Sequence, residues 1–241
     1  MGERDDGRRG GGMNRPRRDQ RHGRSNQRRG GGGGQFYLPR GTVVFVLDIL
    51  QHGGMDSQSH NWNPVAQIIE VPSFKLHEIA LNKGKIVQLQ DKVVLGGEDC
   101  PLGKVQKRLK YTQLTRTSIE MLYPVLSQYI IDNEEKFVSF LNAAGPITIK
   151  RHSLEELPGV GKKMMWDIVN ARERELFKNF ADINARVPGL KIPEILVRRI
   201  IEELGEEELK HYLFVKRTHH GEDQGQHRPL QHNPYSRRAP M

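Results

Sequence analysis

The chain has 241 residues, a formal net charge of +9 and one cysteine, Cys100. A lone cysteine excludes an intramolecular disulfide and a multi-cysteine zinc site, which favours a reducing compartment. No apolar run approaches the roughly 18 residues of a membrane span and no signal peptide opens the chain, so we expect a cytoplasmic protein that makes no membrane contact.

Residues 1–35 are predicted to form a disordered tail, because they contain eleven glycines, no aromatic residue and almost nothing apolar. Ten arginines against four acidic residues make this tail strongly basic. Its Arg-Gly-Gly boxes resemble those of RNA-binding tails, in which arginine pairs with phosphate and stacks on bases. The arginines of these boxes are Arg8, Arg9, Arg28 and Arg29. The alternative is a solubilising extension, with translation starting at Met13.

Residues 36–111 alternate in the manner of β-strands, with turn signals between the runs. About five short strands in roughly 70 residues predict a small barrel of the oligonucleotide/oligosaccharide-binding (OB) kind, with a small sandwich as the alternative. The predicted strands are Thr42–Leu50, Val65–Val71, Phe74–Leu81, Ile86–Leu89 and Lys104–Tyr111.

The last of these strands carries a row of cations. A period of two places Lys104, Arg108 and Lys110 on one face, where they would follow a nucleic-acid backbone. The alternative interpretation is that this face is simply polar and solvated and binds no nucleic acid.

Residues 112–209 change to a helical period and predict an all-α domain. A weakly alternating segment, 210–216, is predicted to return as a strand to the barrel, and residues 217–241 are predicted to be a disordered tail rich in His and Arg. The predicted helices are Thr117–Ile131, Asp132–Asn142, Phe180–Val187 and Pro193–Leu204.

Between the two helical pairs lies a glycine-rich turn, Leu157–Gly161, followed by two lysines. Ser153–Glu156 has the form of a capping box and opens a short helix before the turn. A Pro-Gly-x-Gly turn allows positive φ and exposes backbone, and the next helix presents unpaired N–H groups to an anion. This arrangement resembles the helix-hairpin-helix motif, which holds a backbone phosphate, and a tight turn between helices is the alternative. The predicted contact residues are Pro158, Gly159, Val160, Gly161, Lys162 and Lys163.

A second turn, Pro188–Leu190, resembles a degenerate hairpin of the same kind. It lacks the second glycine, so we expect it to pack the last two helices together and not to bind phosphate.

The body of the chain resembles an archaeal family, the domain of unknown function 655, described as nucleic-acid-binding proteins. The resemblance implies an OB-type barrel joined to tandem helix-hairpin-helix units. It also implies that the ligand is RNA, either ribosomal RNA or RNA associated with the ribosome. The stretches that carry it are Val46–Gly53, Pro64–Ile68, Pro146–Thr148, His152–Lys163, Met165–Trp166 and Tyr212–Val215.

Other groups of residues are weaker candidates. Asp48 and His52, with His60 a loop away, could form a metal or acid–base site, but such residues more often cap a strand. The histidines of the C-terminal tail have no ordered spacing, and Trp166 and Phe177 are predicted core residues. Nothing indicates an enzyme, a metal or a cofactor.

The sequence therefore predicts an α+β protein: a small OB-like β-barrel followed by an all-α tandem helix-hairpin-helix domain, with disordered tails. The predicted function is non-catalytic binding of RNA, with DNA as a second ligand and association with the ribosome. The alternative is a protein-interaction scaffold or an accessory factor that binds DNA structures in transcription or DNA processing. No pattern indicates an oligomeric state.

Overall fold

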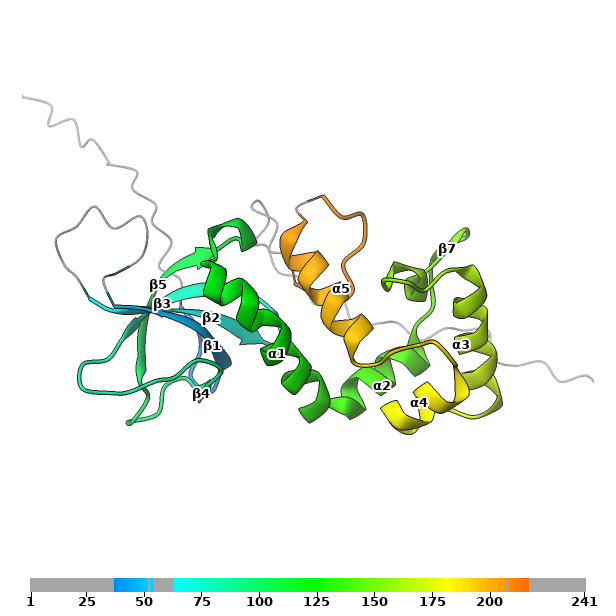
Figure 1. The fold of residues 1–241 in the computed structure, drawn as a ribbon, viewed down its shortest axis with the longest axis horizontal. Coiled ribbons are helices and arrows are strands. Elements are labelled where there is room, and N and C mark those ends of the chain that lie inside the picture. The colour runs from blue at the N-terminus through cyan, green and yellow to red at the C-terminus, as the bar shows by residue number, and fades with distance from the viewer. Residues whose placement is uncertain (1–36, 52, 54–62, 207, 217–241) are drawn as a thin grey trace, which may run out of the picture. The chain divides into compact units, whose positions relative to one another are not determined.

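The computed structural model describes residues 37–51, 53, 63–206 and 208–216. In this part of the chain an antiparallel sheet is followed by helices, so the predicted mixed α+β organisation is confirmed (Figure 1). The sheet has the strand order β4-β1-β2-β3-β5. Its strands are β1 (Val43–Leu50), β2 (Val65–Val71), β3 (Leu76–Leu81), β4 (Lys92–Val94) and β5 (Leu102–Leu109).

The sheet is open. All four strand pairings are antiparallel, and β4 and β5 form its two edges, with no pairing between them in the described residues. The closed barrel that the sequence predicts is therefore not confirmed.

Strand β1 is apolar along most of its length because the sheet is covered on both faces. Phe45 and Leu47 point into the core shared with the helices, whereas Val44 and Val46 point into a second, smaller core. Since successive side chains of a strand alternate between faces, a strand buried on both sides needs an unbroken apolar run. The second core is closed by Val87 and by the residues around β4.

The predicted strand Ile86–Leu89 is wrong, because this segment is irregular. The carboxylate of Asp91 accepts a hydrogen bond from the Gln88 amide at 2.7 Å, and Gln90 takes a φ of 68°. These features make a turn, and the strand that pairs with β1 begins just after it.

The helices largely follow the predicted spans. The first begins one residue earlier than predicted, because the side chain of Thr115 accepts a hydrogen bond from the Ser118 amide and caps it. No helix of the described ranges is long and apolar enough to cross a membrane. The helices are α1 (Arg116–Asp132), α2 (Glu134–Ala143), α3 (Lys162–Arg174), α4 (Phe180–Arg186) and α5 (Glu194–Gly205), with short 3-10 helices η1 (Tyr111–Gln113) and η2 (Ser153–Glu156).

One hydrophobic core runs from the sheet through all the helices. Tyr129 of α1 makes edge contacts with Phe45 and Phe74 of the sheet side and with Phe137 of α2. The helices following β5 are thus packed against the sheet by shared apolar residues.

The segment 210–216 does not form the predicted strand, because its backbone bonds to a side chain instead of to a neighbouring strand. The carboxylate of Glu203 accepts hydrogen bonds from the amides of three successive residues at 2.7–2.9 Å; they are Leu213, Phe214 and Val215. The segment still reaches the sheet, since the Lys216 amide donates to the carbonyl of Ser73.

Candidate nucleic-acid interface

The turn Leu157–Gly161 joins η2 to α3 and is fixed from within. Leu157 and Val160 are buried, and the Val160 amide donates to the Leu157 carbonyl at 3.0 Å. Gly159 is exposed and has a φ of 80°, a conformation that favours glycine. The two apolar anchors hold the turn, while Gly159 and Gly161 face outward.

Gly161 is the N-cap of α3 and does not need to be glycine for its backbone conformation, because its φ is −82°. The expected positive φ therefore belongs to Gly159 alone. A Cβ added at Gly161 would meet no atom within 4 Å. Neither the backbone conformation nor a steric clash therefore explains the glycine at position 161. Its lack of a side chain leaves the backbone accessible to a ligand that approaches from outside the protein.

The start of α3 is positively charged and has no internal counterion. Its N-cap provides no side-chain hydrogen bond, and no acidic residue lies in its first turn. Lys162 and Lys163 are exposed, and neither forms an ion pair with another residue that the structure describes. Unpaired first-turn amides, the helix dipole and two ammonium groups therefore act at one place.

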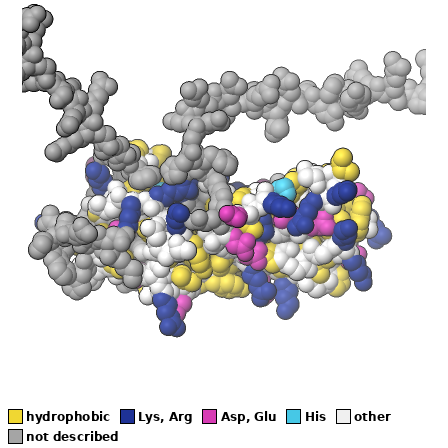
Figure 2. All heavy atoms as spheres, turned by 90° about the horizontal axis from the view of Figure 1, so that it is seen from above, with side chains coloured by type: hydrophobic (Ala, Val, Ile, Leu, Met, Phe, Trp, Pro, Cys, Tyr) yellow, Lys and Arg dark blue, Asp and Glu magenta, His cyan; other side chains and the backbone are white. Residues whose placement is uncertain are grey.

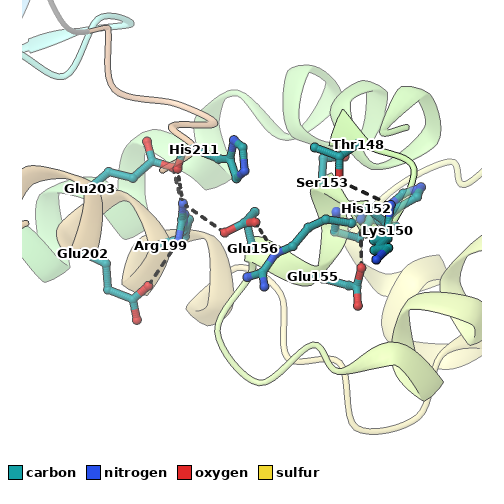
Figure 3. Close-up of polar contacts among 12 residues, drawn as sticks. Thr148, Lys150, His152, Ser153, Glu155, Glu156, Arg199, Glu202, Glu203 and His211 are labelled. Carbon is teal, nitrogen blue, oxygen red and sulfur yellow. Dashed lines mark hydrogen bonds and ion pairs between the residues drawn. The ribbon is translucent and has the colours of Figure 1, made fainter. Parts of the chain in front are cut away.

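An ionic network connects the residues that precede the turn to α5 (Figure 3). Glu156, at the end of η2, accepts a hydrogen bond from Arg151 at 2.6 Å and lies 3.9 Å from a guanidinium nitrogen of Arg199 on α5. Arg199 is only 4% exposed and donates to Glu203 at 2.8 Å. The residues that precede the turn are thereby tied to the last helix.

A capping box places the entry to the turn. The ring Nδ1 of His152 accepts a hydrogen bond from the Leu154 amide at 3.1 Å, and Glu155 accepts one from the His152 amide at 2.8 Å. Burial and the nearby charge of Arg172 lower the pKa of His152, against a smaller opposing effect of Glu155. Both effects favour the neutral ring that can accept this bond.

We expect His152 to make the fold less stable in mild acid. Because its folded-state pKa lies below the unfolded value of about 6.5, its contribution is present above that value and is lost as the pH falls through the folded pKa. An asparagine could keep the cap without titrating. Between pH 7.5 and 5, wild type should therefore lose more unfolding free energy than His152→Asn, by about 1 kcal/mol, measured by chemical denaturation. Parallel losses in the two proteins would contradict this role.

The second turn, between α4 and α5, repeats the geometry of the first. The Leu190 amide donates to the Val187 carbonyl at 3.2 Å, and Gly189 has a φ of 90°. Lys191 stands where the first turn has Gly161, and a Cβ at Gly189 would lie 3.5 Å from Met164 of α3. The second turn therefore lies against α3, a neighbour that the sequence analysis did not expect, and its role in packing α4 against α5 stays a prediction.

The predicted row of cations does not lie on one regular strand face: β5 ends at Leu109, so Lys110 lies just beyond it. The pairing of β5 with β3 shifts register between Glu78 and Ile79 and again between Ile79 and Leu81. As a result Val105 enters one core and Leu109 the other, although a regular strand would place both on the same face. Lys104 and Lys110 are exposed and Arg108 is half-buried.

Several other sequence candidates have a structural role or fall outside the described residues. Asp48 lies inside β1 at a bulge and joins the strand to the start of α1, since its carboxylate accepts hydrogen bonds from the hydroxyl of Thr115 at 2.5 Å and from the Ile49 amide at 2.8 Å. Within the described ranges no group of three His, Cys, Asp or Glu side chains could hold a metal ion. The candidates outside the described residues are Arg8, Arg9, Arg28, Arg29, His52, His60 and the histidines of 217–241.

The prediction that Trp166 is a core residue is wrong. Phe177 is buried as predicted, but Trp166 is 57% exposed. The buried residues of α3 are Met165, Ile168 and Val169, and this stripe leaves position 166 on the outer side. A helical projection of the sequence would have placed Trp166 outside the apolar stripe of α3.

On the face drawn in Figure 2, Lys and Arg side chains lie over the sheet and over the helices. Asp and Glu side chains lie among those over the helices, so the described part of this face carries no continuous basic patch. On this face, any attraction of the described residues for a polyanion is therefore local.

Residues 41–216 match the model of a protein family whose description is "Protein of unknown function (DUF655)". The chain belongs to this family. The uncharacterized protein MJ0038 of Methanocaldococcus jannaschii is 34% identical over 175 residues, which cover 72% of this chain and 79% of that relative.

The DUF655 fold is also similar to a solved structure. The crystal structure of Af1531 from Archaeoglobus fulgidus superimposes with a TM-score of 0.67 and a sequence identity of 37%. The matched region covers 73% of this chain and 99% of Af1531. Both organisms are archaea, as the sequence resemblance leads one to expect.

Proposed function

We propose that this DUF655 protein is a non-catalytic RNA-binding protein that holds a backbone phosphate at the turn Leu157–Gly161 and the first turn of α3. The observation that carries this proposal is Gly161, a glycine with an ordinary φ and open space where its Cβ would be. Beside it, Lys162 and Lys163 have no ion-pair partner among the described residues. A phosphate would meet amides, a helix dipole and two ammonium groups at once.

The proposed contact is with the nucleic-acid backbone and carries no information about base sequence. We propose RNA as the ligand, associated with the ribosome, because the family resemblance favours it, and DNA is the competing polyanion to be tested beside it. The tandem helix-hairpin-helix description, with an OB-like sheet, belongs to the same proposal. The contact would extend to Lys104 and Arg108 of β5, to Lys110 just after it, and to the arginines of residues 1–35.

Lys162→Glu tests the proposal. We expect it to weaken binding of a labelled RNA about fivefold at low salt, and to reduce the slope of log affinity against log salt by about one, because one phosphate contact is lost. Fluorescence anisotropy from low to physiological salt, with DNA of the same sequence in parallel, measures both quantities. Lys83→Glu is the matched control, since Lys83 is also exposed, forms no ion pair with another residue that the structure describes, and lies in the turn after β3. Equal affinity and equal slope for Lys162→Glu and wild type would sink the proposal.

A second function, docking of a protein partner, is favoured by a separate observation. The short hairpin of β6 (Pro146–Thr148) and β7 (Arg151–His152) carries Ile149 at its tip, and this side chain is fully exposed. An exposed isoleucine at a hairpin tip suits a protein partner's apolar pocket. If Lys162→Glu loses RNA binding and Ile149→Ser binds RNA as wild type does, the result would favour the RNA-binding function over protein docking.

A further inference from the structure

The exposed indole of Trp166 stands directly beside the proposed phosphate site. Trp166 follows Lys162 by four residues and Lys163 by three, which places all three side chains on one helix face. All three are exposed. Because side chains on a helix lean toward its N-terminus, we expect the indole to lie over the first turn of α3, which begins at Lys162.

The rest of this helix face carries charges of both signs. Asp167 and Glu173 are exposed on α3 together with Arg174, so two carboxylates accompany the one further exposed arginine. Beyond the two lysines, the contact that the helix offers to a polynucleotide is therefore an aromatic face and not a row of cations. Such a face binds bases by stacking, without preference for sequence.

We propose that Trp166 stacks on an unpaired base whose adjoining phosphate is held at the start of α3, so that the ligand class is single-stranded nucleic acid. The inference rests on the proposed function and deepens it. In a continuous duplex each base is already stacked on its neighbours and unavailable to the indole. A single strand can offer phosphate and base together.

The chain contains two tryptophans, so Trp62→Phe leaves Trp166 as the sole indole reporter. In this full-length background, titration with oligouridine should quench the fluorescence, whereas a blunt RNA duplex bound to the same extent should change it little. Quenching of equal depth by the duplex would overturn the proposal.

Affinity gives the second readout. Trp166→Leu should weaken binding of oligouridine about tenfold, the effect of losing one base–aromatic stack, and leave duplex affinity unchanged. Trp166→Phe should recover part of the loss. Leu176→Ala removes another exposed apolar side chain, outside α3, and should change neither affinity.

The two proposals fail in different ways. If Lys162→Glu weakens binding of both ligands and Trp166→Leu weakens neither, phosphate binding stands and stacking is refuted. If neither variant affects binding, both proposals are refuted.

Discussion

Gly161→Asp is expected to weaken RNA binding about thirtyfold while raising the melting temperature by about 2 °C. An aspartate at an N-cap accepts hydrogen bonds from the second and third amides of the helix and interacts favourably with the helix dipole, which stabilises the protein by about 0.5 kcal/mol relative to glycine. Those amides are the groups that the proposed phosphate needs. Stability and binding should therefore change in opposite directions.

The structure permits this substitution without distortion. The φ of −82° and ψ of 179° at Gly161 are ordinary extended values that aspartate adopts, and its Cβ would enter open space. Thermal unfolding by circular dichroism and RNA titration by anisotropy measure the two effects on the same samples.

Gly161→Ala is the matched control for the carboxylate. It adds the Cβ without a group that can cap the helix or repel phosphate, so its melting temperature should not rise and its affinity should fall less. If Gly161→Asp binds RNA as tightly as wild type, no phosphate is held at this helix start, whatever happens to stability.

Local sequence signals predicted the elements that depend on local interactions. The glycine-rich turn Leu157–Gly161, the presence of a helix after it, and the spans of α4 and α5 follow from helical periodicity and turn residues close to them in the chain. Strand β1 was predicted from its apolar run, because both of its faces are buried.

Features set by distant contacts were not predicted. The regular face expected for β5 is broken by two bulges in its pairing with β3, and Gly103, which lies at one of them, is a local signal that the sequence analysis did not use. The positive φ at Gly159, by contrast, has a local cause that the sequence analysis did not use: Pro158 and Gly159 are the central residues of the turn closed by the hydrogen bond from Val160 to Leu157. The role of Glu203 was also missed, since the amides that it accepts from lie about ten residues further along the chain.

Glu203→Gln is expected to lower the free energy of unfolding by about 3 kcal/mol, because it breaks a buried ion pair and leaves backbone donors unsatisfied. One carboxylate oxygen of Glu203 accepts from Arg199 and from the Leu213 amide, and the other accepts from the amides of Phe214 and Val215. Its side chain has no solvent exposure. A glutamine replaces one of these oxygens by an NH₂ group. This group is itself a hydrogen-bond donor, so it cannot accept the hydrogen bonds of the N–H groups that face it.

The loss should be concentrated in the segment 208–216. Without its anchor, Phe214 is no longer held against Phe137 and Phe140, whose rings lie 5.9 and 5.0 Å from it, and the hydrogen bond from Lys216 to Ser73 opens. Limited trypsin digestion should therefore cut the variant at Lys210 faster than wild type, under conditions where the rest of the chain stays folded.

Glu202→Gln provides the matched control on the same helix. Its carboxylate lies 3.7 Å from Arg199 and its side chain is 43% exposed, so removing its charge should change the unfolding free energy by less than about 1 kcal/mol. Differential scanning calorimetry on both variants compares a buried acceptor of four hydrogen bonds with a solvent-exposed neighbour in the same network. Equal melting temperatures for the two would mean that the charge around Arg199, and not the anchoring of segment 208–216 by Glu203, is what stabilises this end of the protein.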